Sequence, residues 1–183
     1  MCLPNVTSDG EDFRRWLEGA TEPTWTRKQL WLDTLRKERE NGQISTRVRI
    51  LSNQVTDYER YACGFGYRYN GEYEDIRVLH RGEHEIPADL IERDFWIIGR
   101  SIVVTMYYDQ HGRLDGAEVA NPGELADHLR TRDAAWAAAE PLPHGGPGTP
   151  SCTERWQPEE DAERGRRHRP DRGHATAVAA RVA

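Results

Sequence analysis

Three short groups of polar and aromatic residues are the places in this sequence where chemistry could occur. They are Asp57, Tyr58 and Arg60, then Glu74, Asp75 and Arg77, and finally Asp94 with Trp96. Two interpretations of these groups stay open. The carboxylates can cap a helix and the arginines can pair with them. Alternatively, Asp57, Tyr58, Asp75 and Arg77 converge on a shallow polar pocket and, with the other members, bind a ligand.

Other familiar chemical motifs are incomplete. His80 and His84 have the spacing of a metal pair on a helix, but they follow an expected strand and precede Pro87, so the spacing loses that meaning. Gly64 and Gly66 lack the lysine and the following helix of a phosphate loop. Cys63 has no base that can be identified from the sequence and is expected to be a small buried apolar residue. We therefore assign no catalytic residue, no metal and no cofactor.

The distribution of charge limits the class of partner. The formal net charge is -6, while the segment from Pro141 onward holds seven arginines against six acids, so the remainder carries about -7. An acidic body repels phosphate, which makes direct nucleic-acid binding unlikely to be its role, and the acids of the tail dilute its arginines. No apolar run approaches the roughly 18 residues of a membrane span. The first ten residues lack the pattern of a secretory signal, and we expect a cytoplasmic protein.

Helix signals occur at four places. A capping-box pattern at residues 26–29 predicts a helix to Asn41, ended by Gly42, and a second box at residues 56–59 predicts a short helix ended by Gly64 and Gly66. Residues 12–18 favour a lesser helix. Asn121 and Pro122 open a last helix to Ala139, with Trp136 as its core anchor.

Alternating polar and apolar residues predict strands at residues 46–51, 75–80, 94–98, 102–108 and 114–119. Short connections with glycine join the last three strands into a meander. Residues 67–73 resemble a loop or a poorly formed strand. The sequence therefore predicts an α+β fold with an antiparallel or mixed sheet of about five strands and helices packed against it.

Composition divides the chain into three parts. Residues 1–24 form an N-terminal arm with a possible short helix, and residues 25–140 form the α+β domain. Residues 141–183 are rich in Pro, Gly and Arg and hold few large apolar side chains, which predicts a disordered tail. We expect truncation after Glu140 to leave the fold intact.

Several sequence blocks, taken in order, resemble a known family. The blocks are 47–52 (RVRILS), 56–58 (TDY), 74–79 (EDIRVL), 94–98 (DFWII), 106–109 (MYYD), 112–113 (GR) and 116–118 (GAE). Together they are similar to an uncharacterised actinobacterial domain family of unknown function, DUF6879, over residues 25–139, although Gly99 departs from an expected acidic residue. Members of that family have no established activity and are often encoded beside helix-turn-helix regulators. The resemblance implies a binding or regulatory module that acts through a protein partner such as a transcriptional regulator.

A second, more distant resemblance gives the alternative of an enzyme. Residues 92–104 look like the segment of phospholipase D-type domains that carries a His-x-Lys-x4-Asp motif. The corresponding positions are Glu92, Asp94 and Gly99, so the nucleophilic histidine and both of its companions are missing. A phosphate-ester hydrolase on such a degenerate fold would need another mechanism, built on carboxylates such as Asp57, Asp75 and Asp94.

Overall fold

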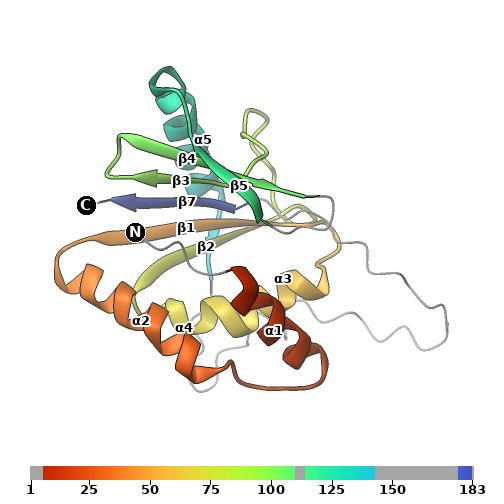
Figure 1. Cartoon of the computed structure of the whole chain (residues 1–183). Coiled ribbons are helices and arrows are strands. Elements are labelled where there is room, and N and C mark those ends of the chain that lie inside the picture. The colour runs from red at the N-terminus through yellow and green to blue at the C-terminus, as the bar shows by residue number, and fades with distance from the viewer. Residues whose placement is uncertain (1–5, 110–113, 143–176, 183) are drawn as a thin grey trace.

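The computed structural model describes residues 6–109, 114–142 and 177–182 and confirms the α+β fold (Figure 1). Its centre is one mixed sheet in the order β5-β4-β3-β7-β1-β2-β6. The strands are β1 (Ile44–Leu51), β2 (Glu74–His80), β3 (Phe95–Ile98), β4 (Ile102–Tyr108), β5 (Leu114–Val119), β6 (Glu140–Pro141) and β7 (Ala177–Val182). The five predicted strands are all present, and β6 and β7 add to them.

The sheet joins a parallel part to an antiparallel part. β1 runs parallel to β2, and a helical crossover links them, as parallel neighbours require. β3, β4 and β5 form the predicted antiparallel meander. The β3–β4 hairpin turns at Gly99 and Arg100, whose φ angles are 57° and 62°. Two successive positive φ angles are those of a type I′ turn, whose twist matches that of a tight hairpin, and glycine adopts such angles without strain.

β7 lies between the two parts of the sheet. It pairs antiparallel with β1 and parallel with β3, so the last strand of the chain occupies the middle of the sheet. The predicted disordered tail falls mostly on residues 143–176, which lie outside the described residues. Its last segment is a strand, which the sequence analysis did not anticipate.

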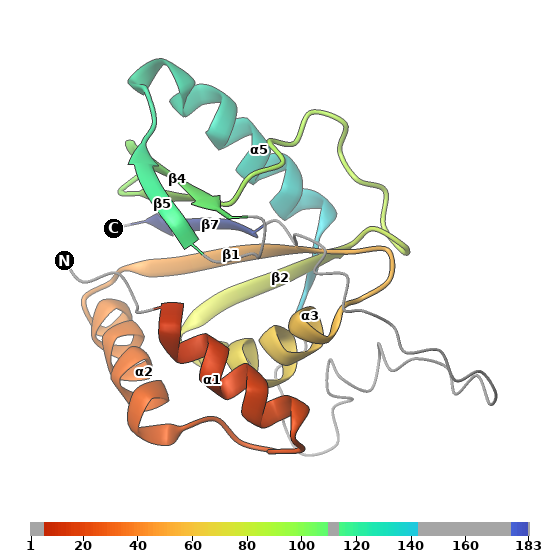
Figure 2. The ribbon, with the colours of Figure 1, turned by 45° about the vertical axis from the view of Figure 1, so that its right-hand side comes forward.

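Helices cover the sheet from both sides (Figures 1 and 2). The helices are α1 (Val6–Leu17), α2 (Trp25–Glu40), α3 (Asp57–Tyr61), the π-helical segment η1 (Ala62–Tyr67), α4 (Arg68–Asn70), the 3-10 turn η2 (Pro122–Glu124) and α5 (Leu125–Ala138). The views show α1 to α4 gathered beside β1 and β2, with α5 on the other side of the sheet. The N-terminal arm joins this layer, because Phe13 of α1 packs on Tyr61 with ring centroids 5.3 Å apart.

Two helix boundaries differ from the prediction. α2 begins at Trp25 after Thr24, so Thr26 is inside the helix and its capping box was wrong. The helix that starts at Asp57 does not end at Gly64; the chain stays helical to Asn70 because η1 widens the turn instead of breaking it. The predicted loop or strand at residues 67–73 was therefore wrong for residues 67–70, whereas residues 71–73 form a turn.

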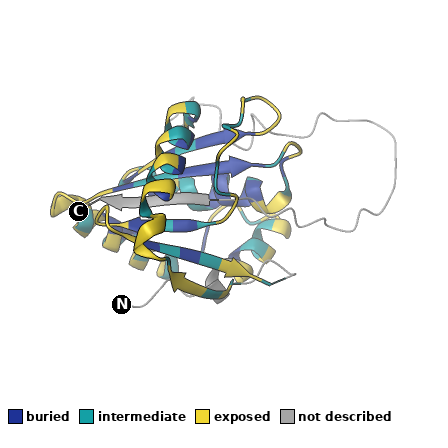
Figure 3. Ribbon diagram, turned by 90° about the horizontal axis from the view of Figure 1, so that it is seen from above, coloured by how far each residue is buried: buried dark blue, intermediate teal, exposed yellow. Residues whose placement is uncertain are grey.

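The core has two apolar clusters, one on each face of the sheet. The first joins β1, β3 and β4 to α5 through Val48, Phe95, Ile97, Val103 and Ala135, and Trp136 packs against it half-buried. Figure 3 shows the buried residues of the strands in dark blue. The second contains Leu51, Val55, Cys63, Ile76, Val78 and Leu142. Cys63 is buried, as predicted.

Candidate functional site

Two arginines lie under the N-terminal helices on one face of β1. Arg47 and Arg49 are two residues apart, so they point to the same face, opposite the face that carries Val48 and Ile50. We call Arg47, Arg49 and the groups around them, Tyr58, Tyr67, Glu74, Asp94, Trp96 and Tyr108, the two-arginine cluster.

Arg47 connects three elements. Its Nε donates a hydrogen bond of 2.9 Å to the Glu74 carboxylate on β2. Its guanidinium carbon lies 5.1 Å from the ring centre of Tyr67 and 5.0 Å from that of Trp96. Burial disfavours this charge, but the Glu74 carboxylate and the Tyr67 group together outweigh that effect, and the pKa of Arg47 is raised. Arg47 is therefore a fixed cation between two aromatic rings.

Arg49 is the more deeply buried arginine, with 6% of its surface exposed. Its Nε has no hydrogen-bond partner among the described residues. Burial lowers its pKa, but the charges of the Tyr67 and Asp94 groups outweigh that effect, so the pKa is raised. A buried guanidinium with an unused N–H is costly. The cluster therefore holds two positive charges within the fold.

Asp94 and Tyr108 form the edge of the cluster. The Tyr108 hydroxyl donates a hydrogen bond of 2.9 Å to the Asp94 carboxylate. Burial of the ring and the neighbouring Asp94 charge both raise the pKa of Tyr108, so its hydroxyl stays protonated and serves as a donor.

The predicted site residues divide between this cluster and other places. Tyr58, Glu74, Asp94 and Trp96 belong to the cluster. Asp57 and Arg60 form an ion pair of 3.2 Å with each other on α3. Asp75 pairs with Arg39 of α2 at 3.7 Å, with both side chains half-exposed. Asp57, Asp75 and Arg77 therefore engage three different partners.

Arg77 stabilises the end of α5. It donates hydrogen bonds of 3.0 Å and 3.3 Å to the carbonyls of Trp136 and Ala139, and its guanidinium carbon lies 4.2 Å from the Trp136 ring centre. A cation at a helix C-terminus satisfies free carbonyls and complements the helix dipole. These contacts are with backbone carbonyls and an aromatic ring, whereas the structural interpretation of this arginine was an ion pair with a carboxylate.

The histidine pair and the phospholipase-like positions have local contacts. The backbone amide of His80 donates to His84 Nδ1 at 3.1 Å within one turn, and no metal-binding group of three or more ligands occurs among the described residues. Glu92 pairs with Arg81 at 3.0 Å. Gly99 forms the hairpin turn. Glu92, Asp94 and Gly99 thus each have a different structural role.

Beside the cluster lies an apolar part of the sheet that we call the open face. It consists of Trp96 and Ile98 of β3 with Ile102, Val104 and Met106 of β4. Ile98 pairs with Ile102, and Trp96 pairs with Val104, so their side chains share a face. The exposed fractions are 37% for Ile98 and 46% for Ile102. This is the face opposite Phe95, Ile97 and Val103, which are buried with α5.

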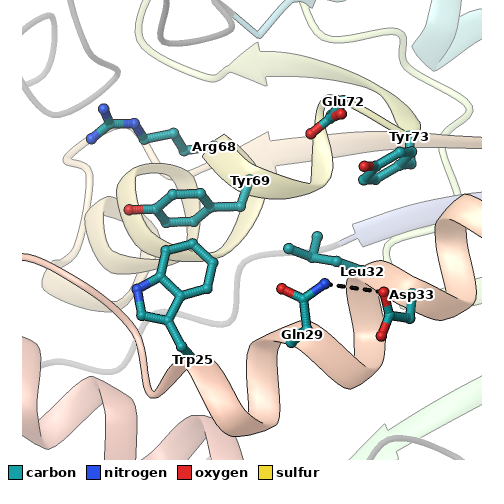
Figure 4. A pocket seen from close by; sticks show the side chains of 8 residues that line it. All are labelled: Trp25, Gln29, Leu32, Asp33, Arg68, Tyr69, Glu72 and Tyr73. Carbon is teal, nitrogen blue, oxygen red and sulfur yellow. Dashed lines mark hydrogen bonds between the residues drawn. The ribbon is translucent and has the colours of Figure 1, made fainter.

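Two grooves lie elsewhere on the described surface. One, of about 300 Å³, lies between α2 and α4, where Tyr69 stands edge-on to Trp25 with ring centres 4.9 Å apart (Figure 4). In the same view Gln29 donates to Asp33 at 3.0 Å. The other, of about 490 Å³, lies where α5 meets β4 and β5 and contains Glu118, Glu124 and the buried His128. Neither includes Arg47 or Arg49.

None of the helices in the described parts of the chain has the length and hydropathy of a membrane span. Searches among curated proteins and among solved structures found no match. A family model does match, over residues 5–144, and its description is Domain of unknown function (DUF6879). That range contains α1 to α5, β1 to β6, the two-arginine cluster and the open face, and the chain therefore belongs to the DUF6879 family.

Proposed function

We propose that the domain is a regulatory binding module and that a helix of its protein partner packs on the open face. The observation that carries this proposal is the contiguous apolar surface formed by Ile98, Ile102, Trp96 and Val104. Exposed apolar patches bordered by polar groups mark interaction surfaces in soluble domains.

We expect the occupant to be a helix, because helices cover the neighbouring strands β1 and β2 on the same side of the sheet. On β1 and β2 this side of the sheet is packed by α1 to α4 and by η1, whose Tyr67 lies against Arg47. A partner helix laid over β3 and β4 would continue that layer. Sheets bury an apolar face against helices of this kind in α+β proteins.

Charge favours a basic partner. The chain up to Glu140 carries a formal charge of about -7, since the whole chain has -6 and the segment from Pro141 has +1. Complementary charge accelerates association and excludes acidic competitors. A helix-turn-helix regulator, of the kind often encoded beside members of this family, is both helical and basic. This chemistry makes a regulator of that kind the first partner to test.

The test measures binding of the full-length chain to that regulator by pull-down and calorimetry. Ile98→Asp and Ile102→Asp should each weaken binding at least tenfold, because a carboxylate cannot be buried against an apolar helix. Ala126→Asp is the matched control, since it adds the same charge at an exposed position of α5 on the opposite side. All three variants should melt within a few degrees of the parent chain.

Equal binding by Ile98→Asp, Ile102→Asp and the parent would exclude the open face. Failure of the parent chain to bind the regulator would exclude that partner.

A further inference from the structure

β1 and β3 are not direct neighbours in the sheet, because β7 lies between them. The gap that β7 fills is a second candidate binding surface, separate from the open face. The family match ends at residue 144, but the strand that fills this gap, β7, begins at Ala177. Without β7 the sheet order leaves β5-β4-β3 and β1-β2-β6 as two separate three-stranded parts. We propose that this gap is a peptide-binding groove of the domain, and that residues 177–182 are its tethered ligand.

The walls of the groove are fixed by the domain itself. α5 contacts strands on both sides of the gap, and Val48 of β1 and Phe95 of β3 belong to one apolar cluster with Ala135 and Ala139. Two strands that flank a third lie roughly 10 Å apart. The facing edges of β1 and β3 each offer a row of backbone donors and acceptors, as in β-strand addition.

The tethered strand has a defined direction between the two edges. It runs antiparallel to β1 and parallel to β3, so it forms a different hydrogen-bond pattern on each side. The groove therefore accepts an extended segment that pairs with both edges at once.

Arg47 and Trp96 select the residue at the centre of the ligand. Residue 179 pairs with Arg47 on one side and with Trp96 on the other. The Arg47 guanidinium carbon nevertheless lies 5.0 Å from the Trp96 ring centre. The Arg47 side chain must therefore extend across the position of residue 179 in the sheet. Directly paired residues share a face of the sheet, so only a small residue is compatible with this crossing. The residue there is alanine.

The experiment uses the full-length chain with Ala179→Pro, which removes a ladder N–H and a compatible φ angle from the middle of the strand. Ala175→Pro is the control, since it lies before the strand. Amide hydrogen exchange should show protection factors falling at least tenfold for those amides of β1 and β3 that pair with β7. Amides of the β1–β2 and β4–β5 ladders should keep their protection.

A synthetic peptide of residues 175–183 should then bind Ala179→Pro and restore that protection. The same peptide with leucine at position 179 should bind at least tenfold more weakly. The parent chain should bind the peptide poorly at micromolar concentration, because its own segment competes at an effective concentration on the order of 1 mM.

Ala179→Leu in the full-length chain provides a second variant, in case proline unfolds the protein. Unchanged protection in both variants would overturn the proposal. Global loss of protection in both variants would also overturn it, because residues 177–182 would then be an integral part of the core. Equal binding of the alanine and leucine peptides would overturn the role of Arg47 and Trp96.

Discussion

At the scale of single residues, Asp12 holds α1 to the start of α2. Its carboxylate accepts hydrogen bonds from the Thr24 hydroxyl at 2.6 Å, from the Thr24 amide at 3.2 Å and from Arg15 at 3.0 Å. Burial raises the pKa of Asp12, but the bonds from Thr24 and Arg15 and the charge of Arg27 together lower it below its ordinary value. The ionised carboxylate is thus the form that the fold prefers.

The first prediction concerns the acid range. Because the folded pKa of Asp12 lies below the unfolded value near 3.9, its stabilisation is present above that pH and is lost as pH falls through the folded pKa. Asp12→Asn should lower the free energy of unfolding by about 1 kcal/mol at pH 7 and by less at pH 2. Urea unfolding of both chains from pH 2 to pH 7 measures the difference. A constant difference across that range would contradict the assignment.

The sequence analysis placed Arg47 and Arg49 in a predicted strand, but it did not predict that they form a site. Their alternation with Val48 and Ile50 predicted a strand with a polar face, and such a face usually meets solvent. Here η1 covers that face, and the covering depends on contacts such as Arg47 with Tyr67 that no local pattern records. Tyr108 was missed for the same reason, because Asp94 is fourteen residues away.

At the scale of elements, the junction between β1 and α3 depends on one carboxylate. Glu59 is fully buried, with 0% of its surface exposed. One of its oxygens accepts from the amide and hydroxyl of Ser52, and the other accepts from the amide and hydroxyl of Thr56. Thr56 in turn accepts from the Glu59 amide, which confirms the predicted capping box.

The second prediction follows from these four donors. Glu59→Ala should destabilise the chain by about 3 kcal/mol, because it leaves buried donors without an acceptor and removes half of the capping box. Asp57→Asn is the matched control two residues away. It loses only an exposed pair with Arg60 and should cost about 0.5 kcal/mol. Chemical denaturation measures both, and equal losses would show that the Glu59 contacts add nothing.

Elements with a strong local signal were predictable, and those that depend on distant contacts were not. The capping box at Thr56 and the glycine after α2, with a φ of 78° at Gly42, are local features. The π-helical path through Gly64 and Gly66 is not, because glycine usually ends a helix and here Phe65 and Cys63 are held in it by burial.

At the scale of the whole molecule, the packed structure continues past Glu140. Leu142 is 1% exposed in the second apolar cluster, and its amide donates to the carbonyl of Ile76 at 2.9 Å. Composition alone placed the boundary before it, since Pro141 opens a segment poor in apolar residues. One leucine changes the composition of this segment too little for a composition analysis to detect that it is buried.

The third prediction separates the two boundaries. Leu142→Ala in the full-length chain should cost about 2–5 kcal/mol, the range for a buried leucine. A chain that ends at residue 140 should therefore melt well below one that ends at residue 144, whereas both lack β7. Calorimetry of the two truncated chains measures this difference, and identical melting temperatures would favour the boundary after Glu140.

The position of β7 also has a consequence for how the protein is synthesised. β7, at the centre of the sheet, leaves the ribosome after the six other described strands, and translation of residues 143–176 takes about 2–7 s at roughly 5–20 residues per second. During that interval the nascent domain exposes two unpaired edges, each able to pair with another nascent chain. Charged side chains on a strand discourage such pairing. Arg47 and Arg49 are charges of this kind on β1, beside the edge that β7 covers once it has been made.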